Sequence, residues 1–243
     1  MKTESQSKLE EIKSRITKAA EKVERDPESI TLIGVTKKKD VEIIDDFIRA
    51  GLTNIGESYI QEAEEKLPQL KNPVRKHFIG HLQSGKVNKA VKLFDVIQTV
   101  DREKILRKIS TAAKNERKIP YPILIQVNLS EEENKSGCTK EEFWKLAELA
   151  VSDKYKKNIQ LKGLMTMAPV DAVTIEQNIE FYSKVNRFFK EVQKVYPCCT
   201  ELSIGMSDSF EEAILCGSTM VRIGTALFGA RLPQITGFSF KND

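Results

Sequence analysis

The sequence is poor in the residues that mark unusual protein classes. Its 243 residues include only 12 glycines, 8 prolines and 4 cysteines. These low contents exclude collagen-like, low-complexity and intrinsically disordered chains. With 40% hydrophobic and 30% charged residues, the chain is instead typical of a globular protein. At this length the core is large enough to fold without a metal or a disulfide.

The sequence also lacks a concentrated charge and a long apolar run. Its 39 basic residues exceed the 35 acidic residues by only four, and this excess is spread along the chain. Nucleic-acid binders usually gather basic charge on one face or tail, so we expect no nucleic-acid partner. The acidic N-terminal segment does not resemble a secretory signal. No run approaches the roughly 18 apolar residues of a spanning helix, so we expect no membrane association.

The cysteines and histidines show no spacing typical of a redox or metal site. Cys138, Cys198, Cys199 and Cys216 include no C-x-x-C pair, and two of them are adjacent, so that a bridge between them would be strained. The H-E-x-x-H pattern is absent. We therefore expect a reduced, cytoplasmic protein without a metal site, and a monomer.

Short apolar runs alternate with amphipathic helical patterns along the chain. Continuously apolar strands are typical of a parallel sheet that is covered by helices on its outer side. Eight such units predict a single (β/α)8 TIM-type barrel over residues 1–243, preceded by a helix over about 8–24. An open doubly wound sheet is the alternative, but its glycine-rich first turn is missing. The predicted strands cover residues 31–36, 52–56, 77–80, 95–100, 123–129, 161–167, 201–205 and 219–224.

A lysine directly follows the first predicted strand. In a barrel, the carboxyl ends of the strands surround the active site. An amine that is partly desolvated there has a lowered pKa and can attack a carbonyl group. Alternation along the strand favours Lys37 over Lys38 as the residue that points inward. Lys37 is therefore a candidate for Schiff-base formation, although a solvated loop of three lysines would also explain it.

The loops after the seventh and eighth predicted strands have the composition of a phosphate site. They read SIGMSDS over 203–209 and RIGTALFGAR over 222–231. Gly205 and Gly224 allow the backbone to approach a ligand, and Ser207 and Thr225 offer hydroxyl groups. A lysine on the same rim makes this a site for a phosphorylated carbonyl compound. Both pyridoxal 5′-phosphate and a sugar phosphate handled by an aldolase meet that description.

These residues lie within a longer series of motifs that resembles the pyridoxal phosphate homeostasis protein family. That family resembles the N-terminal barrel of alanine racemase, a fold-type III pyridoxal phosphate protein. The resemblance implies that Lys37 carries the cofactor as an internal aldimine. It also implies that Ser207, Gly224 and Thr225 hold the phosphate, and that Arg222 approaches the pyridine nitrogen. The motifs are GVTK (34–37), IGESYIQE (55–62), HFIGHLQSGK (77–86), IQTVD (97–101), QVNLSEEENKSG (126–137), LKGLMTM (161–167), LSIGMSDSFEEAI (202–214) and GSTMVRIGTALFGAR (217–231).

The chain departs from the usual family pattern at three positions. Ser58 stands where the family usually has asparagine, in G-E-N. Gly85 stands where it often has asparagine, in Q-S-N-K, and Ser209 replaces an aspartate two residues after Ser207. None of these departures removes the lysine or the phosphate loops.

The resemblance leaves two functions to weigh, a non-enzymatic carrier of the cofactor and an amino-acid racemase. A guanidinium only donates hydrogen bonds, so Arg222 would keep the ring nitrogen unprotonated and weaken carbanion chemistry. A racemase of this type also uses a tyrosine from a C-terminal β domain, and with the sequence ending at Asp243 we expect that domain to be absent. We therefore expect a carrier or buffer in vitamin B6 homeostasis, with apo-enzymes that need pyridoxal phosphate as recipients.

Overall fold

A computed structural model describes residues 2–130, 136–169 and 174–229 of the chain. The predicted domain over residues 1–243 and the last motif, which ends at Arg231, both extend beyond these ranges. Within the described ranges, no helix combines the length and the apolarity needed to cross a membrane.

Eight parallel strands close into a barrel in the order in which they occur in the sequence. The barrel closes between the first and last strands, where Thr31 pairs with Met220 and Gly34 with Ile223. This arrangement confirms the predicted (β/α)8 fold and excludes the open sheet. The strands are β1 (Thr31–Val35), β2 (Asn54–Glu57), β3 (Arg75–Phe78), β4 (Val96–Val100), β5 (Tyr121–Gln126), β6 (Ile159–Met165), β7 (Glu201–Ser203) and β8 (Met220–Ile223).

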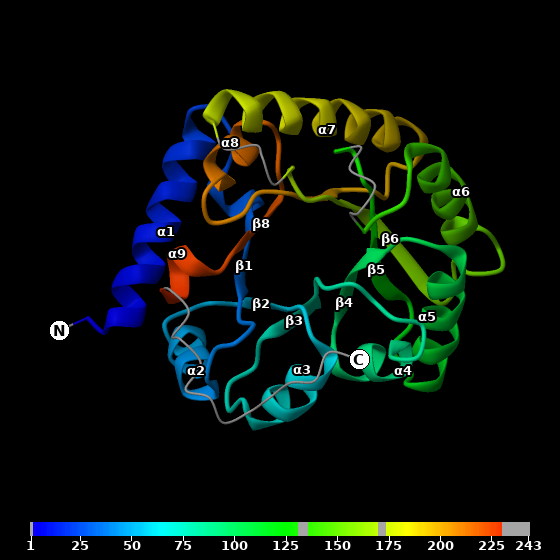
Figure 1. Ribbon diagram of the computed structural model, residues 1–243, viewed down its shortest axis with the longest axis horizontal. Helices are drawn as coiled ribbons and strands as arrows, with labels where there is room; N and C mark the ends of the chain where they lie inside the picture. The colour runs from blue at the N-terminus through cyan, green and yellow to red at the C-terminus, as the bar shows by residue number, and fades with distance from the viewer. Residues whose placement is uncertain (1, 131–135, 170–173, 230–243) are drawn as a thin grey trace.

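Helices follow the strands and form a ring around the barrel (Figure 1). Two of these helices, α6 and α7, begin with a capping box, which is formed at Thr139 and at Thr174. The helices are α2 (Val41–Arg49), α3 (Ile60–Lys66), α4 (Val87–Leu93), α5 (Glu103–Asn115), α6 (Lys140–Val151), α7 (Ile175–Val195), α8 (Phe210–Leu215) and α9 (Thr225–Phe228), with 3-10 turns η1 (Pro27–Ser29) and η2 (Leu67–Gln69).

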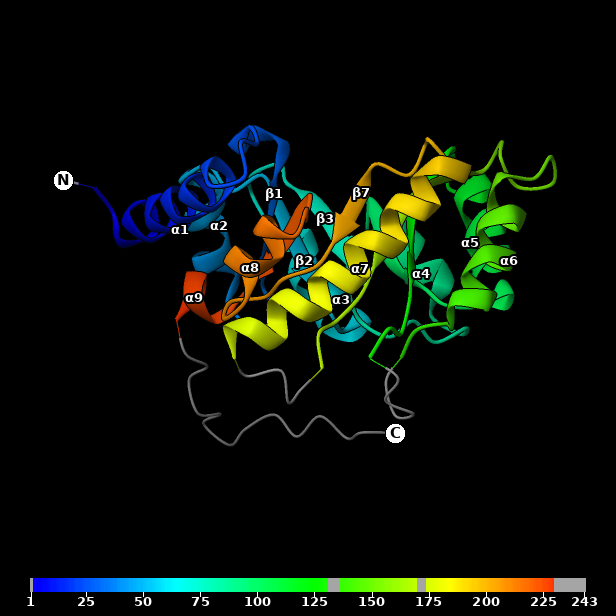
Figure 2. The same ribbon diagram turned by 90° about the horizontal axis from the view of Figure 1, so that it is seen from above.

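An additional helix, α1 (Glu4–Glu21), precedes the first strand. The predicted start at about residue 8 was wrong, because Thr3 and Gln6 form a capping box that begins the helix earlier. The predicted end near residue 24 was also too late. Figures 1 and 2 show α1 beside α8 and α9, on the side of the barrel where β1 meets β8. A salt bridge of 2.8 Å between Arg15 and Glu211 joins α1 to α8.

The apolar core has two layers of unequal size. The larger layer lies between the strands and the helices. The smaller layer is a cluster contributed by β1, β4, β5, β6 and β8, and its alternation with the outer layer places it inside the barrel. Buried polar side chains occupy part of the same interior, among them Gln98 and Ser203. The inner apolar cluster consists of Ile33, Val96, Leu124, Met165 and Met220.

Candidate functional site

The five predicted site residues come from three neighbouring strands. Lys37 lies in the turn after β1, and Ser207 lies in the loop after β7. Arg222 belongs to β8, and Gly224 and Thr225 link that strand to α9. Because β8 pairs with both β1 and β7, the barrel brings these residues to one sector of its carboxyl-terminal rim.

Lys37 and Lys38 differ in their surroundings. Lys37 is half-buried, and it has the same strand parity as Ile33, which lies inside the barrel. Lys38 is exposed and has a positive φ of 59°, and its backbone N–H donates to Glu62 Oε1 at 2.5 Å. The backbone therefore turns sharply just after Lys37.

The third lysine of this run links two loops of the rim. Lys39 Nζ donates to the carbonyl oxygens of Phe228 at 3.0 Å and Gly229 at 3.1 Å. These oxygens lie at the C-terminal end of α9, where a positive charge is favourable. Lys39 thereby fixes the loop that carries Lys37 against the helix that follows Gly224.

The loops after β7 and β8 meet at the hydroxyl group of Ser207. Ser207 Oγ accepts hydrogen bonds from the backbone N–H groups of Gly224 at 3.1 Å and Ala226 at 3.4 Å. The turn into this loop needs glycine at position 205, which has a φ of +91° and where an added Cβ would lie 2.6 Å from Ala213 Cβ. Two N–H groups that converge on one oxygen fit a phosphate group. Thr225 is exposed beside them.

Ser209, one of the three departures from the family pattern, has a structural partner. Its hydroxyl group lies 2.8 Å from the hydroxyl of Tyr182 on α7 and accepts from Met206 N–H at 3.4 Å. Ser209 is buried. It therefore holds the loop against α7.

Arg222 is a buried cation without an acidic partner among the described residues. Its side chain donates from Nη1 to Ser203 Oγ at 2.7 Å and from Nη2 to the carbonyl oxygen of Thr166 at 2.9 Å. Burial lowers the pKa of Arg222 to about 10, so the guanidinium stays charged at neutral pH. A buried charge that is paired only with neutral dipoles is costly. It fits a ligand that offers a lone pair or a negative charge, such as the ring nitrogen of pyridoxal phosphate.

A series of hydrogen bonds continues from Arg222 into the barrel interior. Ser203 Oγ donates to Gln98 Oε1 at 2.7 Å, and Gln98 Nε2 lies 3.0 Å from His77 Nδ1. His77 Nε2 lies 3.0 Å from Asn54 Oδ1. Sequence reasoning did not identify these residues as part of the site. The available signal was a polar side chain within an otherwise apolar strand, as in HFIG and VIQTV.

A buried ion pair supports the rim directly beside Lys37. Lys66 Nζ lies 2.6 Å from Glu57 Oε1 and 2.7 Å from Glu62 Oε1, and it donates to the carbonyl oxygen of Thr36 at 2.7 Å. Thr36 Oγ1 also donates to Glu57 Oε1 at 2.6 Å. Burial raises the pKa of Glu57, and Lys66 and the Thr36 hydroxyl oppose this rise. This cluster, which the sequence analysis missed, fixes the residue that precedes Lys37.

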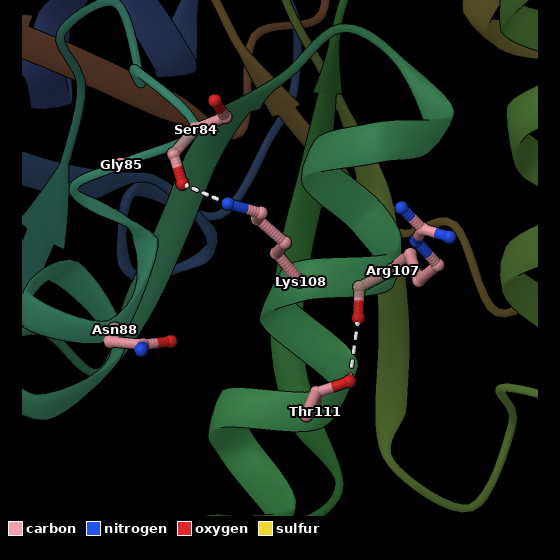
Figure 3. A pocket seen from close by; sticks show the side chains of 6 residues that line it. All are labelled: Ser84, Gly85, Asn88, Arg107, Lys108 and Thr111. Atoms are coloured by element: carbon pink, nitrogen blue, oxygen red, sulfur yellow. Dashed lines mark hydrogen bonds between the residues drawn. The ribbon is translucent and has the colours of Figure 1, made fainter.

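A surface hollow between α4 and α5 lies apart from this sector and includes none of the five predicted residues. Figure 3 shows Lys108 reaching across it toward Ser84, whose carbonyl oxygen accepts from Lys108 Nζ at 2.8 Å. Gly85, a departure from the family pattern, also lines it. An added Cβ at Gly85 would meet nothing within 4 Å. Glycine is therefore not needed here for lack of space.

Comparison with known proteins gives matches over nearly the whole chain. The family described as "Alanine racemase, N-terminal domain" matches residues 8–232. A pyridoxal phosphate homeostasis protein from Vibrio alginolyticus is 39% identical over 231 residues, which cover 93% of this chain and 97% of that protein.

Solved structures agree with this assignment. PipY from Synechococcus elongatus, with PLP bound, is 30% identical and has a TM-score of 0.75, covering 88% of this chain and 100% of that one. An alanine racemase from Clostridium difficile is 17% identical and has a TM-score of 0.70, covering 93% of this chain and 60% of that one. The racemase shares the fold. The chain therefore belongs to the alanine racemase N-terminal domain family and, within it, to the pyridoxal phosphate homeostasis proteins.

Proposed function

We propose that this protein binds pyridoxal 5′-phosphate at the rim sector formed by β1, β7 and β8. The observation that carries the proposal is the buried guanidinium of Arg222, which has no acidic partner among the described residues. The converging N–H groups of Gly224 and Ala226 lie on the same rim. The names of the relatives and the PLP bound to PipY support the same ligand.

Each residue has a distinct task in this proposal. Pyridoxal phosphate supplies an aldehyde that bonds covalently to an amine and a ring that withdraws electrons. Lys37 offers the amine from a half-buried position. Ser207, Gly224 and Thr225 bind the phosphate group through hydroxyl and backbone donors, and Arg222 donates to the ring nitrogen. No residue is assigned to proton transfer at a substrate.

The charge of Arg222 favours a carrier over a racemase. Because its pKa is about 10, the guanidinium keeps its proton at neutral pH. Transfer of that proton to the ring would leave a neutral base in the barrel interior. The guanidinium therefore keeps the ring nitrogen it faces as an acceptor. A ring held in that state withdraws electrons weakly, so a carbanion on a bound amino acid would be poorly stabilised. This is the physical reason to propose storage and delivery rather than turnover.

In the cell, we infer that the protein buffers the reactive aldehyde and transfers it to apo-enzymes that require it. The half-exposed rim suits a ligand that must also leave. The four cysteines of the chain are free thiols, and three of them are buried. Free thiols are typical of proteins in the reducing cytoplasm. We propose that one chain, acting as a monomer, forms the whole cofactor site.

Ser207→Ala should accelerate cofactor loss without unfolding the protein. The change removes a hydroxyl that contacts both phosphate loops, and a hydrogen bond to a charged group contributes about 1.5–3 kcal/mol. We expect release about 10-fold or more faster, measured by transfer to an apo-enzyme that requires pyridoxal phosphate. Ser209→Ala on the same loop separates direct contact from support of the loop, because its hydroxyl contacts Tyr182 instead, and it should accelerate release less than Ser207→Ala does. Equal rates for wild type and Ser207→Ala would contradict the phosphate assignment.

The same preparation separates the carrier from the racemase. Incubation of the loaded wild-type protein with alanine and other amino acids should give racemisation at background. Transfer of the cofactor to the apo-enzyme should restore its activity. Sustained turnover of any amino acid would instead identify an enzyme.

A further inference from the structure

A single file of hydrogen bonds crosses the barrel interior from Arg222 to the opposite end. Arg222 Nη1 lies 2.7 Å from Ser203 Oγ, which in turn lies 2.7 Å from Gln98 Oε1. Gln98 Nε2 lies 3.0 Å from His77 Nδ1, and His77 Nε2 lies 3.0 Å from Asn54 Oδ1. The members come from β8, β7, β4, β3 and β2. Asn54 lies at the first residue of its strand and also borders a hollow at the amino-terminal end of the barrel.

The direction of donation along this file is fixed by its first member. Because a guanidinium only donates, Ser203 Oγ accepts from Arg222 and its own proton is directed to Gln98 Oε1. The amide nitrogen of Gln98 then faces His77 Nδ1. This ring nitrogen has to accept, so the proton of a neutral His77 is on Nε2, which donates to Asn54 Oδ1. A reversed Gln98 amide would place a second donor on Ser203 and leave the Ser203 hydroxyl proton without an acceptor among the described residues.

The surroundings leave these groups few alternatives. Ser203, Gln98 and His77 are each 0% exposed. Apart from the file, Gln98 Nε2 has one weak contact, at 3.8 Å from Met220 Sδ in the inner apolar cluster. Burial lowers the pKa of His77 to about 3, so the ring is neutral at physiological pH. The file therefore has a single arrangement of protons.

We propose that Ser203, Gln98 and His77 are positioning residues that orient the Arg222 guanidinium toward the pyridine nitrogen of the cofactor. This inference rests on the proposed function. Two of the five guanidinium N–H groups are directed to Ser203 and Thr166, which fixes the plane of the group. The remaining N–H groups have no partner among the described residues and are therefore available to a ligand. The file thus makes Arg222 a rigid donor rather than a mobile cation.

The first test reads the proton arrangement in the cofactor-free protein. The chain has only two histidines, His77 and His81, so His81→Gln leaves one imidazole in a ¹⁵N NMR spectrum. We expect a neutral ring protonated on Nε2 between pH 6 and 8. Addition of pyridoxal phosphate should shift the Nδ1 resonance, because polarisation of the file changes when Arg222 gains an acceptor. An Nδ1 proton, an imidazolium, or no shift on cofactor binding would overturn the proposal.

The second test interrupts the file and reads the bound cofactor. Gln98→Met keeps the size of the side chain but removes both of its hydrogen bonds. We expect a displaced absorption maximum of the bound cofactor and release that is several-fold faster. Thr99→Val is the matched control, since Thr99 is the next residue on β4, is buried, and has a hydroxyl without a partner in the part of the chain that the structure describes. It should leave the absorption maximum unchanged.

The outcomes distinguish this inference from the function on which it rests. A wild-type protein that takes up no pyridoxal phosphate would refute the proposed function and, with it, the role of the file. If the wild type binds the cofactor and Gln98→Met has the same absorption maximum and release rate, only the positioning role is refuted. If Gln98→Met fails to fold, the response of the His77 resonance to the cofactor in the His81→Gln protein decides the question.

Discussion

Lys37→Ala should abolish covalent attachment of pyridoxal phosphate. The methyl group of alanine cannot bond to the aldehyde, so only the phosphate contacts and Arg222 would hold the ligand. We expect the wild-type protein to be yellow, and the variant to lose the cofactor during gel filtration. Borohydride reduction followed by mass spectrometry should place the cofactor on the peptide that contains Lys37 in the wild type and on no peptide in the variant.

The neighbouring lysine provides the control for this experiment. Lys38 is exposed, and its backbone N–H, rather than its side chain, makes the bond to Glu62. Lys38→Ala should therefore keep the colour, the borohydride-trapped peptide and the folded state. If Lys38→Ala loses the cofactor and Lys37→Ala retains it, then the direction that we infer from strand alternation is wrong.

The barrel could be predicted because each strand carries its own signal. Residues buried on both faces read as continuous apolar runs, and in β4 and β8 every residue is buried. The predicted ends of the elements were less accurate, because they depend on capping hydrogen bonds that the spacing of apolar residues does not reveal. The start of α1 is an example, since Thr3 and Gln6 begin the helix before its first apolar residue.

The candidate site could be predicted only as far as local patterns extend. Lys37, Ser207 and Gly224 follow strands directly, so the fold itself assigns them to the rim. His77, Gln98 and Ser203 lie on three different strands. Their contacts exist only after the barrel closes. A single buried polar residue in an apolar run indicates that a partner exists but does not say which one.

The Glu57–Lys66 pair is a second feature that arises only from the closed fold. The side chain of Glu57 is 0% exposed and that of Lys66 is 7% exposed. Glu57 Oε2 has no hydrogen-bond partner among the described residues, so the carboxylate depends on contacts at Oε1 alone. Lys66 supplies the positive charge in those contacts and also binds the Thr36 carbonyl. Loss of this ammonium group should therefore affect both stability and the position of Lys37.

Lys66→Met should lower the free energy of unfolding by about 3–5 kcal/mol at neutral pH, because it leaves a buried carboxylate without its counter-ion. Burial already raises the pKa of Glu57, and loss of Lys66 removes an interaction that lowers it. A carboxyl group with a raised folded-state pKa costs stability as pH rises through that pKa. The deficit should therefore shrink as pH falls and Glu57 takes up a proton. Urea denaturation at pH 5 and pH 8 measures both effects.

The double variant Lys66→Met/Glu57→Gln tests whether the unpaired charge is the cause. A neutral amide in place of the carboxylate removes the buried charge, so most of the lost stability should return. The pH dependence that Glu57 gives to the stability deficit should also disappear. Cofactor retention should recover less, because the bond from Lys66 to the Thr36 carbonyl is still missing and the turn before Lys37 has lost a support. Equal stability of the single and double variants would show that packing of the Lys66 side chain, rather than its charge, maintains this part of the rim.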